Sequence, residues 1–300
     1  MKPGVGLIGV GPLAGQPTPP GWVPAAGPPP ELSEAEFFNF CRLIHRHAGI
    51  HLSPQKKALL QARLVKLVQD RGLGSYQEYY RRVVEDKSGR ELTCLLDAVS
   101  TNQTAFWREP AHFVYLAREI VPEWRRAKGR DSSRWLWSAG CSSGEEPYTL
   151  AMVLLTALDP EELKRIRIFA ADLNTQMLAQ AQRGIYPEDR AASLPPEWRR
   201  RFFQKGHGRW TGYLRVKPEV RELVEFFHLN LMDPFDFQEK FDLIFCRNVM
   251  IYFDRQTQAA VVEKLYRSLK RGGYLFLGHS ESLSNLRHRF TYVKPTIYRK

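Results

Sequence analysis

The residues from Arg134 to Leu155 read RWLWSAGCSSGEEPYTLAMVLL: a short apolar run, a turn of small residues and an apolar helix that begins near a proline. Three further apolar runs follow, RIRIFAADLN, FDLIFCRN and GGYLFLGHS, and helical patterns such as QTQAAVVEKLYRSLKRGG separate them. This alternation predicts an α/β domain with a doubly wound parallel sheet. Because ligands in such sheets bind beyond the carboxyl ends of the strands, we expect the chemistry in the turns after these runs.

The turn after the first run, Gly140 to Gly144, does not have the pattern of a phosphate-binding turn. It lacks the GxGxxG spacing of a dinucleotide site and the GK[ST] ending of a phosphate loop. Glu145 and Glu146 follow at once and would repel a pyrophosphate. We therefore expect a nucleoside-like ligand without phosphate, and S-adenosylmethionine fits because it carries a sulfonium and an ammonium group.

The same carboxylates have a second interpretation, which the local sequence favours equally. Ser143 and Glu146 have capping-box spacing, and Pro147 and the acidic side chains suit a first helical turn. Asp172 ends the second apolar run, where an acidic side chain can accept hydrogen bonds from ribose hydroxyls, although aspartate is also a common turn residue. Its position one βα unit after the small-residue turn favours the cofactor interpretation.

Polar side chains also follow the later apolar runs. Asn230, Arg247 and Asn248 occur in HLNLMD and CRNVMIYF, where amide groups could hydrogen-bond an adenine edge and an amino-acid tail. The second segment lacks the Asn/Asp-Pro-Pro-aromatic tetrapeptide that is associated with methylation of amino nitrogens on nucleobases or glutamine. That absence weighs against such an acceptor.

The composition is that of a soluble, folded protein. The 300 residues are 43% hydrophobic, and the longest apolar run, near Leu150 to Leu158, is far shorter than the roughly 18 residues of a membrane-spanning helix. Pro and Gly interrupt the start of the chain, so the expected location is cytoplasmic. The four cysteines form no CxxC pair, and no metal site is predicted. The net charge of +12 predicts attraction to an acidic partner without identifying it.

Changes in composition divide the chain into three parts. Residues 1–30 contain nine Pro and seven Gly, which predicts a disordered tail. Residues 31–100 have a helical pattern and are expected to form an all-α domain. Residues 101–300 form the predicted α/β domain, with a small antiparallel insertion at about 187–228, where Gly-punctuated short strands interrupt the βα alternation.

Two features stand out in the helical segment. Ser33 and Glu36 have capping-box spacing at its start, and Gly49 supplies a helix stop. A second helix is expected near residues 53–70, with a basic face beside its apolar stripe; the face consists of Lys56, Arg63 and Lys66. On the residues alone, such a face is more often simply solvated than a docking surface.

With these segments in place, the chain resembles the CheR-type chemotaxis receptor glutamate methyltransferases. The resemblance covers nearly everything after residue 31 and is carried, in family order, by STNQTAFWREPAHF, WSAGCSSGEEPYTLA, FAADLNTQMLAQAQRGIY, FDLIFCRNVMIYFD and LFLGHSESL. It implies a helical N-terminal domain, a Rossmann-like class I methyltransferase domain with a small antiparallel β insertion, and S-adenosylmethionine as cofactor without a metal. The matching cofactor positions are Asn102, Thr104, Arg108, Glu146, Asp172, Asn230, Leu231, Arg247 and Asn248. Arg108 and Tyr252 match residues proposed to act in methyl transfer.

The resemblance also implies a reaction and partners. The reaction transfers the methyl group of S-adenosylmethionine to glutamate side chains of methyl-accepting chemotaxis receptors, giving glutamate methyl esters and S-adenosylhomocysteine in sensory adaptation. Glu-rich cytoplasmic helices of these receptors would dock on the basic face of Lys56, Arg63 and Lys66, and in some members a receptor C-terminal peptide adds to the β insertion. A monomer that neither inserts into membranes nor binds nucleic acid is expected.

Two other functions stay open at this stage. A nucleic-acid methyltransferase would explain the charge, but the chain has no recognisable RNA-binding module. A non-catalytic protein that binds S-adenosylmethionine is the other alternative, against which the presence of Arg108 and Tyr252 argues.

Overall fold

The computed structural model describes residues 31–126 and 133–300, which form two compact units. The helical unit contains the described residues up to Thr101 together with Tyr252–Asp254, and the α/β unit contains Asn102–Ile251 and Arg255–Lys300. The Pro/Gly-rich segment that was predicted to be disordered lies outside the described residues. Among the residues described, no helix has the length and apolar character needed to cross a bilayer.

The helical unit is built from short amphipathic helices. The predicted capping box is confirmed, because the Glu36 N–H donates to Ser33 Oγ over 3.3 Å and the Ser33 N–H donates to Glu36 Oε2 over 2.9 Å. Gly49 ends the first helix in the left-handed conformation. Phe40 and Tyr79, both fully buried and stacked 6.1 Å apart, join the first and third α-helices. The elements are α1 (Glu34–Ala48), η1 (Pro54–Lys56), α2 (Lys57–Asp70), α3 (Tyr76–Glu85) and α4 (Arg90–Val99).

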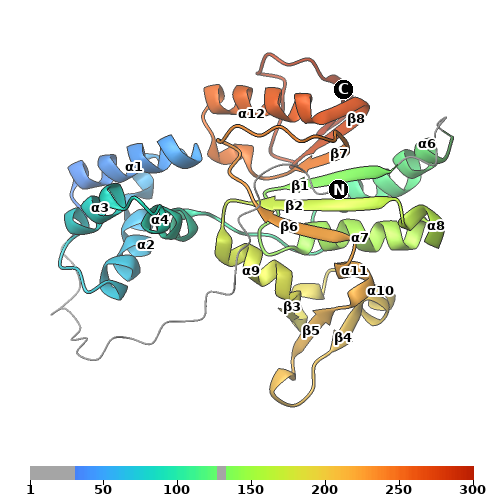
Figure 1. Cartoon of the computed structure of the whole chain (residues 1–300), viewed down its shortest axis with the longest axis horizontal. Helices are drawn as coiled ribbons and strands as arrows, with labels where there is room; N and C mark the ends of the chain where they lie inside the picture. The colour runs from blue at the N-terminus through green and yellow to red at the C-terminus, as the bar shows by residue number, and fades with distance from the viewer. Residues whose placement is uncertain (1–30, 127–132) are drawn as a thin grey trace. The chain divides into compact units, whose positions relative to one another are not determined.

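The α/β unit is organised around one large sheet (Figure 1). Over the described residues its strand order is β6-β2-β1-β7-β8-β10-β9; the first five are parallel, and β10 is antiparallel to both its neighbours. The four predicted apolar runs are strands β1, β2, β7 and β8, which confirms the doubly wound fold. The bounds are β1 (Arg134–Ala139), β2 (Ile166–Asp172), β6 (Val224–His228), β7 (Phe241–Cys246), β8 (Leu269–Leu277), β9 (Thr291–Lys294) and β10 (Ile297–Arg299).

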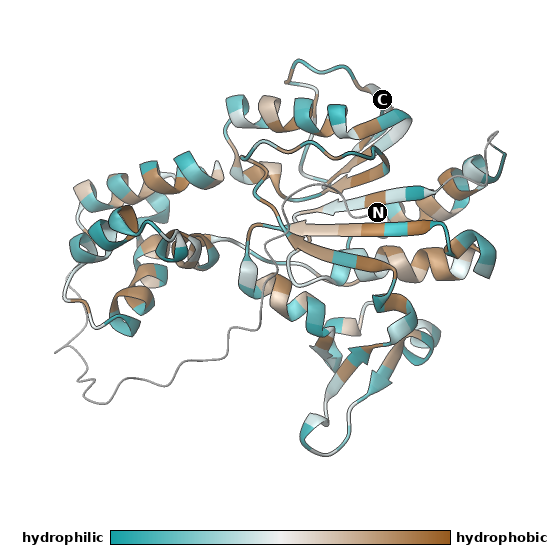
Figure 2. Ribbon diagram, viewed as in Figure 1, coloured by the Kyte–Doolittle hydropathy of each residue, from teal (hydrophilic) through white to brown (hydrophobic). Residues whose placement is uncertain are grey.

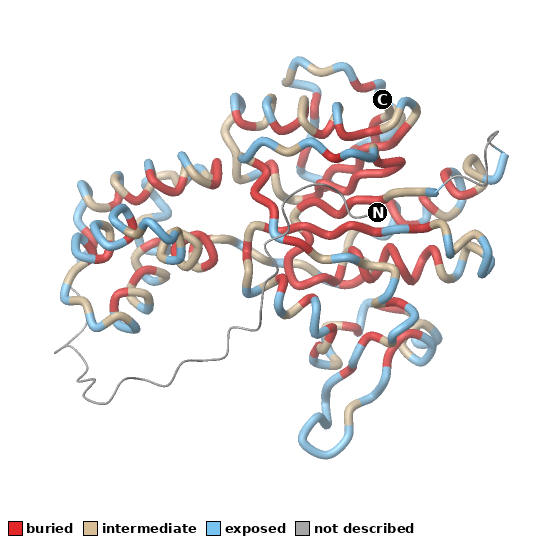
Figure 3. Tube along the Cα trace, in the orientation of Figure 1, coloured by how far each residue is buried: buried red, intermediate tan, exposed pale blue. Residues whose placement is uncertain are grey.

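Burial explains why the central strands are so apolar. Strand β7 is buried along its whole length, and β2 is buried at every position except Arg167. Figure 3 shows these central strands as buried, and Figure 2 shows apolar residues along them. A parallel sheet that is covered on both faces needs apolar side chains on both, so its central strands carry continuous apolar runs and not an alternating pattern.

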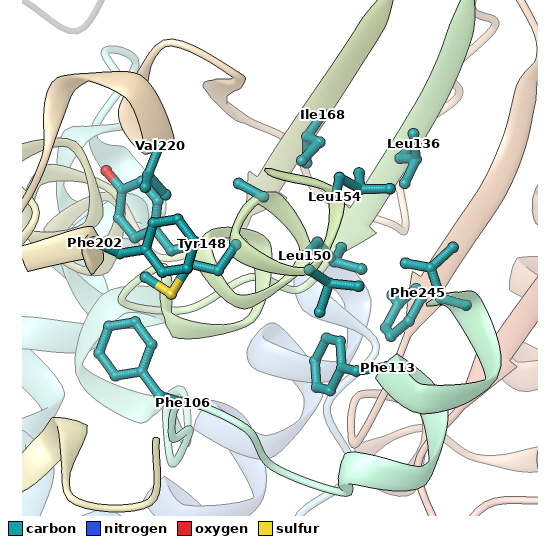
Figure 4. Packing of buried hydrophobic residues seen from close by; sticks show 14 of the residues in the cluster. Phe106, Phe113, Leu136, Tyr148, Leu150, Leu154, Ile168, Phe202, Val220 and Phe245 are labelled. Atoms are coloured by element: carbon teal, nitrogen blue, oxygen red, sulfur yellow. The ribbon is translucent and has the colours of Figure 1, made fainter. Parts of the chain in front are cut away.

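Helix α7 provides much of the core on one face of the sheet. Its Leu150 and Leu154 pack in one buried cluster with Leu136 of β1, Ile168 of β2 and Phe245 of β7 (Figure 4). This packing holds the start of α7 against the ends of the central strands. The helical elements of the unit outside the insertion are α5 (Pro110–Tyr115), the π-helix η2 (Leu116–Ile120), α6 (Val121–Arg126), α7 (Glu145–Ala157), α8 (Pro160–Leu163), α9 (Thr175–Arg183), η5 (Met250–Tyr252) and α12 (Arg255–Ser268), of which η5 ends in the helical unit.

The insertion between α9 and the large sheet contains a small antiparallel sheet in the order β3-β5-β4. Its extent needs a correction, because residues 224–228, which fell within the predicted range of 187–228, form β6 and pair in parallel with β2. Strand β6 (VEFFH) is an edge strand in which only Phe227 is buried, so polar residues interrupt it and it lacks a continuous apolar run. The elements are β3 (Ile185–Pro187), η3 (Glu188–Ala191), α10 (Pro196–Phe202), β4 (Phe203–Lys205), η4 (Gly208–Trp210), β5 (Tyr213–Val216) and α11 (Pro218–Arg221).

Candidate functional site

Strand β1 lies where the connections of the large sheet change direction. From β1 the chain adds β2 and β6 on one side, and later β7 and β8 on the other. Ligand crevices of doubly wound sheets open at such a switch point, outside the carboxyl ends of the strands. Residues 140–146 after β1 and residues 247–251 after β7 therefore define the candidate site.

The turn after β1 has an unusual backbone that orients Asp172. Gly140 has φ 82°, and a Cβ atom there would lie 2.4 Å from Val249 Cγ2, so only glycine fits. Ser142 has φ 49°, and its N–H donates to Asp172 Oδ2 over 2.7 Å. The N–H of Asn174 donates to Asp172 Oδ1 over 2.8 Å. These two bonds hold the buried Asp172 carboxylate in one orientation at the end of β2.

The capping-box interpretation of Ser143 and Glu146 is wrong. Helix α7 begins at Glu145 with Gly144 as its N-cap, and Ser143 Oγ donates to Glu145 Oε2 over 2.6 Å. Glu145 is fully buried and also forms an ion pair with Arg190 of η3, in the insertion. No signal in the sequence pointed to Arg190, which lies 45 residues away in an irregular segment.

Glu146 links the ends of β1 and β7. Its carboxylate accepts a hydrogen bond from Ser138 Oγ over 2.7 Å and one from Arg247 Nη1 over 3.1 Å. Its side chain is 12% exposed. Burial raises the pKa of the Glu146 carboxyl, and Arg247 and Ser138 act in the opposite direction. A cationic ligand would stabilise the ionised form of such a carboxylate.

Arg247, which was predicted to contact the cofactor, forms ion pairs through its guanidinium with Glu109 and Glu146. Its side chain is 1% exposed, and its Nη2 lies 2.9 Å from Glu109 Oε2. The rings of Phe113 and Phe245 lie 5.5 and 5.6 Å from the guanidinium carbon. Arg247 therefore holds the carboxylates of Glu109 and Glu146 in place, and its contact with the cofactor stays a prediction.

Glu109 is a site residue that was not predicted from the sequence. Its position directly after Arg108 was the only signal that could have indicated it. Burial opposes its ionisation, but Arg247 and the His279 N–H outweigh burial and lower its pKa. His112 Nδ1 and His279 Nε2 lie 3.6 and 3.9 Å from Glu109 Oε2, a grouping that could surround a cation. Here Arg247 supplies the positive charge at this carboxylate, and burial lowers the pKa of His112 to about 3, so this histidine is neutral.

The other predicted strand-end residues lie after β6 and β7. Asn248, with φ 59°, donates from Nδ2 to Glu109 Oε1 over 3.3 Å, so it joins the Glu109 network. Asn230 and Leu231 are buried after β6, and Lys264 of α12 donates to the Leu231 carbonyl. They therefore follow a strand that is separated from β1 by β2.

The segment that precedes α5 contributes the remaining predicted cofactor residues. The Asn102 carbonyl accepts from Ser142 Oγ over 2.9 Å, which ties this segment to the turn after β1. Thr104 is half-buried. The Arg108 side chain donates to the Gln103 carbonyl over 2.8 Å, while the Arg108 carbonyl accepts from Arg247 Nη2 over 2.5 Å. The segment is thus connected to both ends of the switch point.

Tyr252 and the predicted docking residues belong to the helical unit. The Tyr252 carbonyl accepts from the His51 N–H over 2.8 Å. Lys56 and Lys66 are exposed, as a docking role requires. Arg63 is half-buried, and its guanidinium donates to the carbonyls of Val99 and Ser100 at the end of α4. Its side chain is therefore already used within the helical unit.

These features define an α/β domain that binds a nucleoside-type cofactor. Two carboxylates, Glu146 in the first turn of α7 and Asp172 at the end of β2, accompany the β1 turn, where a phosphate-binding domain would present bare backbone N–H groups.

Comparisons with known proteins identify the family within that class. The model of the SAM binding domain of CheR methyltransferases matches residues 102–299, and the model of the CheR all-alpha domain matches residues 35–100. The chain therefore belongs to the CheR methyltransferase family, and its cofactor is S-adenosylmethionine, as the resemblance implied.

Curated relatives match over nearly their whole length. The chemotaxis protein methyltransferase of Borreliella burgdorferi is 37% identical over 273 residues, which cover 90% of this chain and 95% of that protein. Its namesake from Salmonella typhimurium is 38% identical over 89% of this chain and 90% of that protein. The chemotaxis protein methyltransferase of Escherichia coli is 37% identical over 89% of this chain and 91% of that protein.

Proposed function

We propose that this methyltransferase esterifies glutamate side chains of methyl-accepting chemoreceptors, producing glutamate methyl esters and S-adenosylhomocysteine. The observation that carries the proposal is the Glu146 carboxylate, which is 12% exposed at the switch point and held by Ser138 and Arg247. It suits a cofactor that is cationic and free of phosphate. The names of the relatives support a role in chemotaxis. A cytoplasmic location is part of the proposal.

The chemistry of carboxyl methylation suits a site of this kind. Because a glutamate side chain has a pKa near 4.3, the acceptor is already ionised at neutral pH and needs no general base. The enzyme has mainly to align the acceptor oxygen, the methyl carbon and the sulfur in one line. The carboxylate and the sulfonium neutralise each other as the methyl group moves, so exclusion of water favours the transition state.

We assign the transfer step to Arg108 and Tyr252. Arg108 shapes the acceptor site without a tight ion pair to the nucleophile, since such a pair would stabilise the ground state. Tyr252 presents its ring or hydroxyl to the sulfonium, where cation–π attraction is available. Cofactor contacts are assigned to Asn102, Thr104, Arg108, Glu146, Asp172, Asn230, Leu231, Arg247 and Asn248.

Receptor recognition is assigned to two surfaces. Lys56 and Lys66 are proposed to attract the Glu-rich receptor helices, while Arg63 supports this face by holding the end of α4. The hairpin between β4 and β5 exposes Trp210 and Tyr213, and the outer edges of β3 and β4 could accept a receptor peptide as an added strand. A monomer suffices for both interactions.

Incubation with methyl-labelled S-adenosylmethionine and receptor cytoplasmic fragments tests the proposal. We expect base-labile label in the receptor, as methyl esters give, and no label in a fragment whose acceptor glutamates are replaced by alanine. Label in RNA, or no transfer to any receptor of the host despite cofactor binding, would overturn the proposal.

Arg108→Ala is expected to lower turnover while cofactor binding is retained, and unchanged turnover would remove Arg108 from the mechanism.

A further inference from the structure

Glu281 is a buried carboxylate outside the residues assigned so far. It follows β8 in the segment GHSESL and is 6% exposed. Its Oε2 accepts from the N–H of Gly278 over 2.6 Å and from the N–H of Asn248 over 2.7 Å. Its Oε1 accepts from the N–H of Ile251 over 3.2 Å. One side chain therefore binds the backbone that follows β7 to the backbone that follows β8.

The backbone that Glu281 holds has little freedom to relax. Asn248 has φ 59°, a left-handed conformation that residues other than glycine rarely adopt. A Cβ atom on Gly278 would lie 2.3 Å from Asn248 Nδ2 and 2.8 Å from Asn248 N, so the two segments approach more closely than any other residue at position 278 would allow. Unusual conformations of this kind persist where surrounding interactions enforce them.

The buried Glu281 carboxylate is stabilised by the backbone N–H groups that donate hydrogen bonds to it. Burial raises the pKa of Glu281, and hydrogen bonds from the N–H groups of Gly278, Asn248 and Ile251 counter it. Charge-assisted hydrogen bonds to backbone N–H groups are stronger than neutral ones, especially away from water. These hydrogen bonds connect Glu281 to the turn after β7.

The turn from Arg247 to Tyr252 carries groups that the proposed function uses at both ends. Asn248, a proposed cofactor contact, is held directly by Glu281. Tyr252, a proposed transfer residue, follows Ile251, the last residue that Glu281 holds. The Tyr252 carbonyl is held in turn by the His51 N–H. Glu281 thus fixes the turn at Asn248 and at Ile251, the residue that immediately precedes Tyr252.

We propose that Glu281 is a positioning residue for methyl transfer, which holds the turn so that Asn248 meets the cofactor and Tyr252 meets the reacting methyl group. This inference rests on the proposed function. It predicts that loss of the carboxylate impairs both cofactor affinity and turnover of molecules that remain folded.

The test compares Glu281→Gln, which keeps the shape but points an NH2 donor at backbone donors, with the exposed control Glu239→Gln. Cofactor affinity is measured by calorimetry, turnover is normalised to active sites by titration with S-adenosylhomocysteine, and the folded fraction is measured by circular dichroism. For Glu281→Gln we expect affinity and turnover per active site each to fall roughly ten- to hundredfold, the range for a lost charge-assisted hydrogen bond. The control is expected to match the wild type.

A double-mutant cycle with Tyr252→Ala, which removes both the ring and the hydroxyl, separates positioning from simple destabilisation. If Glu281 acts through the turn, Glu281→Gln costs several-fold less turnover in the Tyr252→Ala background than in the wild type. Equal costs in both backgrounds, or wild-type affinity and turnover per active site, would overturn the inference. Should Glu281→Gln not fold, Glu281→Asp, which keeps the charge but is shorter, is expected to show the same losses at smaller size, and wild-type values would again overturn it.

Failure of the proposed function gives a different result. A wild-type protein that binds S-adenosylmethionine but methylates no receptor fragment would overturn that function, while the predicted loss of cofactor affinity in Glu281→Gln could still be measured without any acceptor. Wild-type receptor methylation by Glu281→Gln, at unchanged affinity, would overturn only the role of Glu281.

Discussion

Glu145 and Glu146 are neighbours at the start of α7, and each pairs with an arginine, but the two pairs differ in which partner is accessible. Glu145 is fully buried, and its partner Arg190 is 39% exposed on the insertion side. Glu146 is 12% exposed, and its partner Arg247 is 1% exposed. In the first pair the arginine covers the carboxylate, whereas in the second the arginine lies behind it. The first arrangement is suited to fastening the insertion, and the second to presenting an anion to a ligand.

The largest effect is expected from Arg247→Met. The substitution leaves Glu109 and Glu146 buried without their cation, so the free energy of unfolding should fall by about 3–5 kcal/mol, with loss of cofactor binding. Urea unfolding and calorimetry measure the two effects, and Arg183→Met, at an exposed arginine of α9, is the control. Adding Glu109→Gln and Glu146→Gln should restore much of the stability without restoring cofactor binding. Wild-type stability of the single variant would contradict the role given to Arg247.

Glu146→Gln should weaken cofactor affinity roughly ten- to hundredfold, because the ligand loses a buried anion while the side chain keeps its shape. Stability should change little or rise, since burial raises the pKa of this carboxyl and so opposes its charge. Calorimetric titration with S-adenosylmethionine checks the affinity. A variant that binds the cofactor normally would show that Glu146 serves the protein network alone.

Arg190→Met tests the other half of the comparison. The buried Glu145 would keep only Ser143 among the partners described above, so we expect about 1–3 kcal/mol less stability at unchanged affinity for S-adenosylmethionine. Chemical denaturation and calorimetry give both values, and Arg190→Lys should retain part of the stability. If affinity fell as far as in Glu146→Gln, the contrast between the two pairs would be lost.

His112, beside the Glu109 carboxylate, should make stability depend on pH. Burial lowers its pKa in the folded protein to about 3, against about 6.5 when unfolded, so the unfolded chain binds a proton first as the pH falls. Stability is therefore lost as the pH drops below about 6.5, by at most about 1.4 kcal/mol per pH unit from this group. Denaturation of His112→Gln between pH 7 and 5 should show a shallower slope than His207→Gln, at an exposed histidine. Equal slopes would indicate that His112 is not the group responsible.

The sequence was informative where local pattern and burial coincide. The carboxyl-terminal parts of β1, β2 and β8 and the whole of β7 are buried, which accounts for their apolar runs, and the α1 capping box is purely local. Strand β6 was misassigned because it is a short edge strand with only Phe227 buried, so its sequence lacks the apolar run that marks the central strands. The pairs Glu145–Arg190 and Arg247–Glu109 join residues 45 and 138 positions apart, and such contacts follow from the tertiary fold and leave no local signal.

The smallest effect on activity is expected from substitutions of the exposed charges Lys56 and Lys66. Lys56→Glu together with Lys66→Glu should lower receptor methylation only a few-fold at low salt, because pairs between exposed charges contribute about 1 kcal/mol or less and are screened by salt. Cofactor affinity should stay at the wild-type value. Lys87→Glu, at an exposed lysine between α3 and α4, is the control for net charge. As the salt concentration is raised, the methylation rate of the double variant should approach that of the wild type, because salt screens the charges in both proteins. If the double variant matched the control at low salt, Lys56 and Lys66 would not be the charges that recognise the receptor.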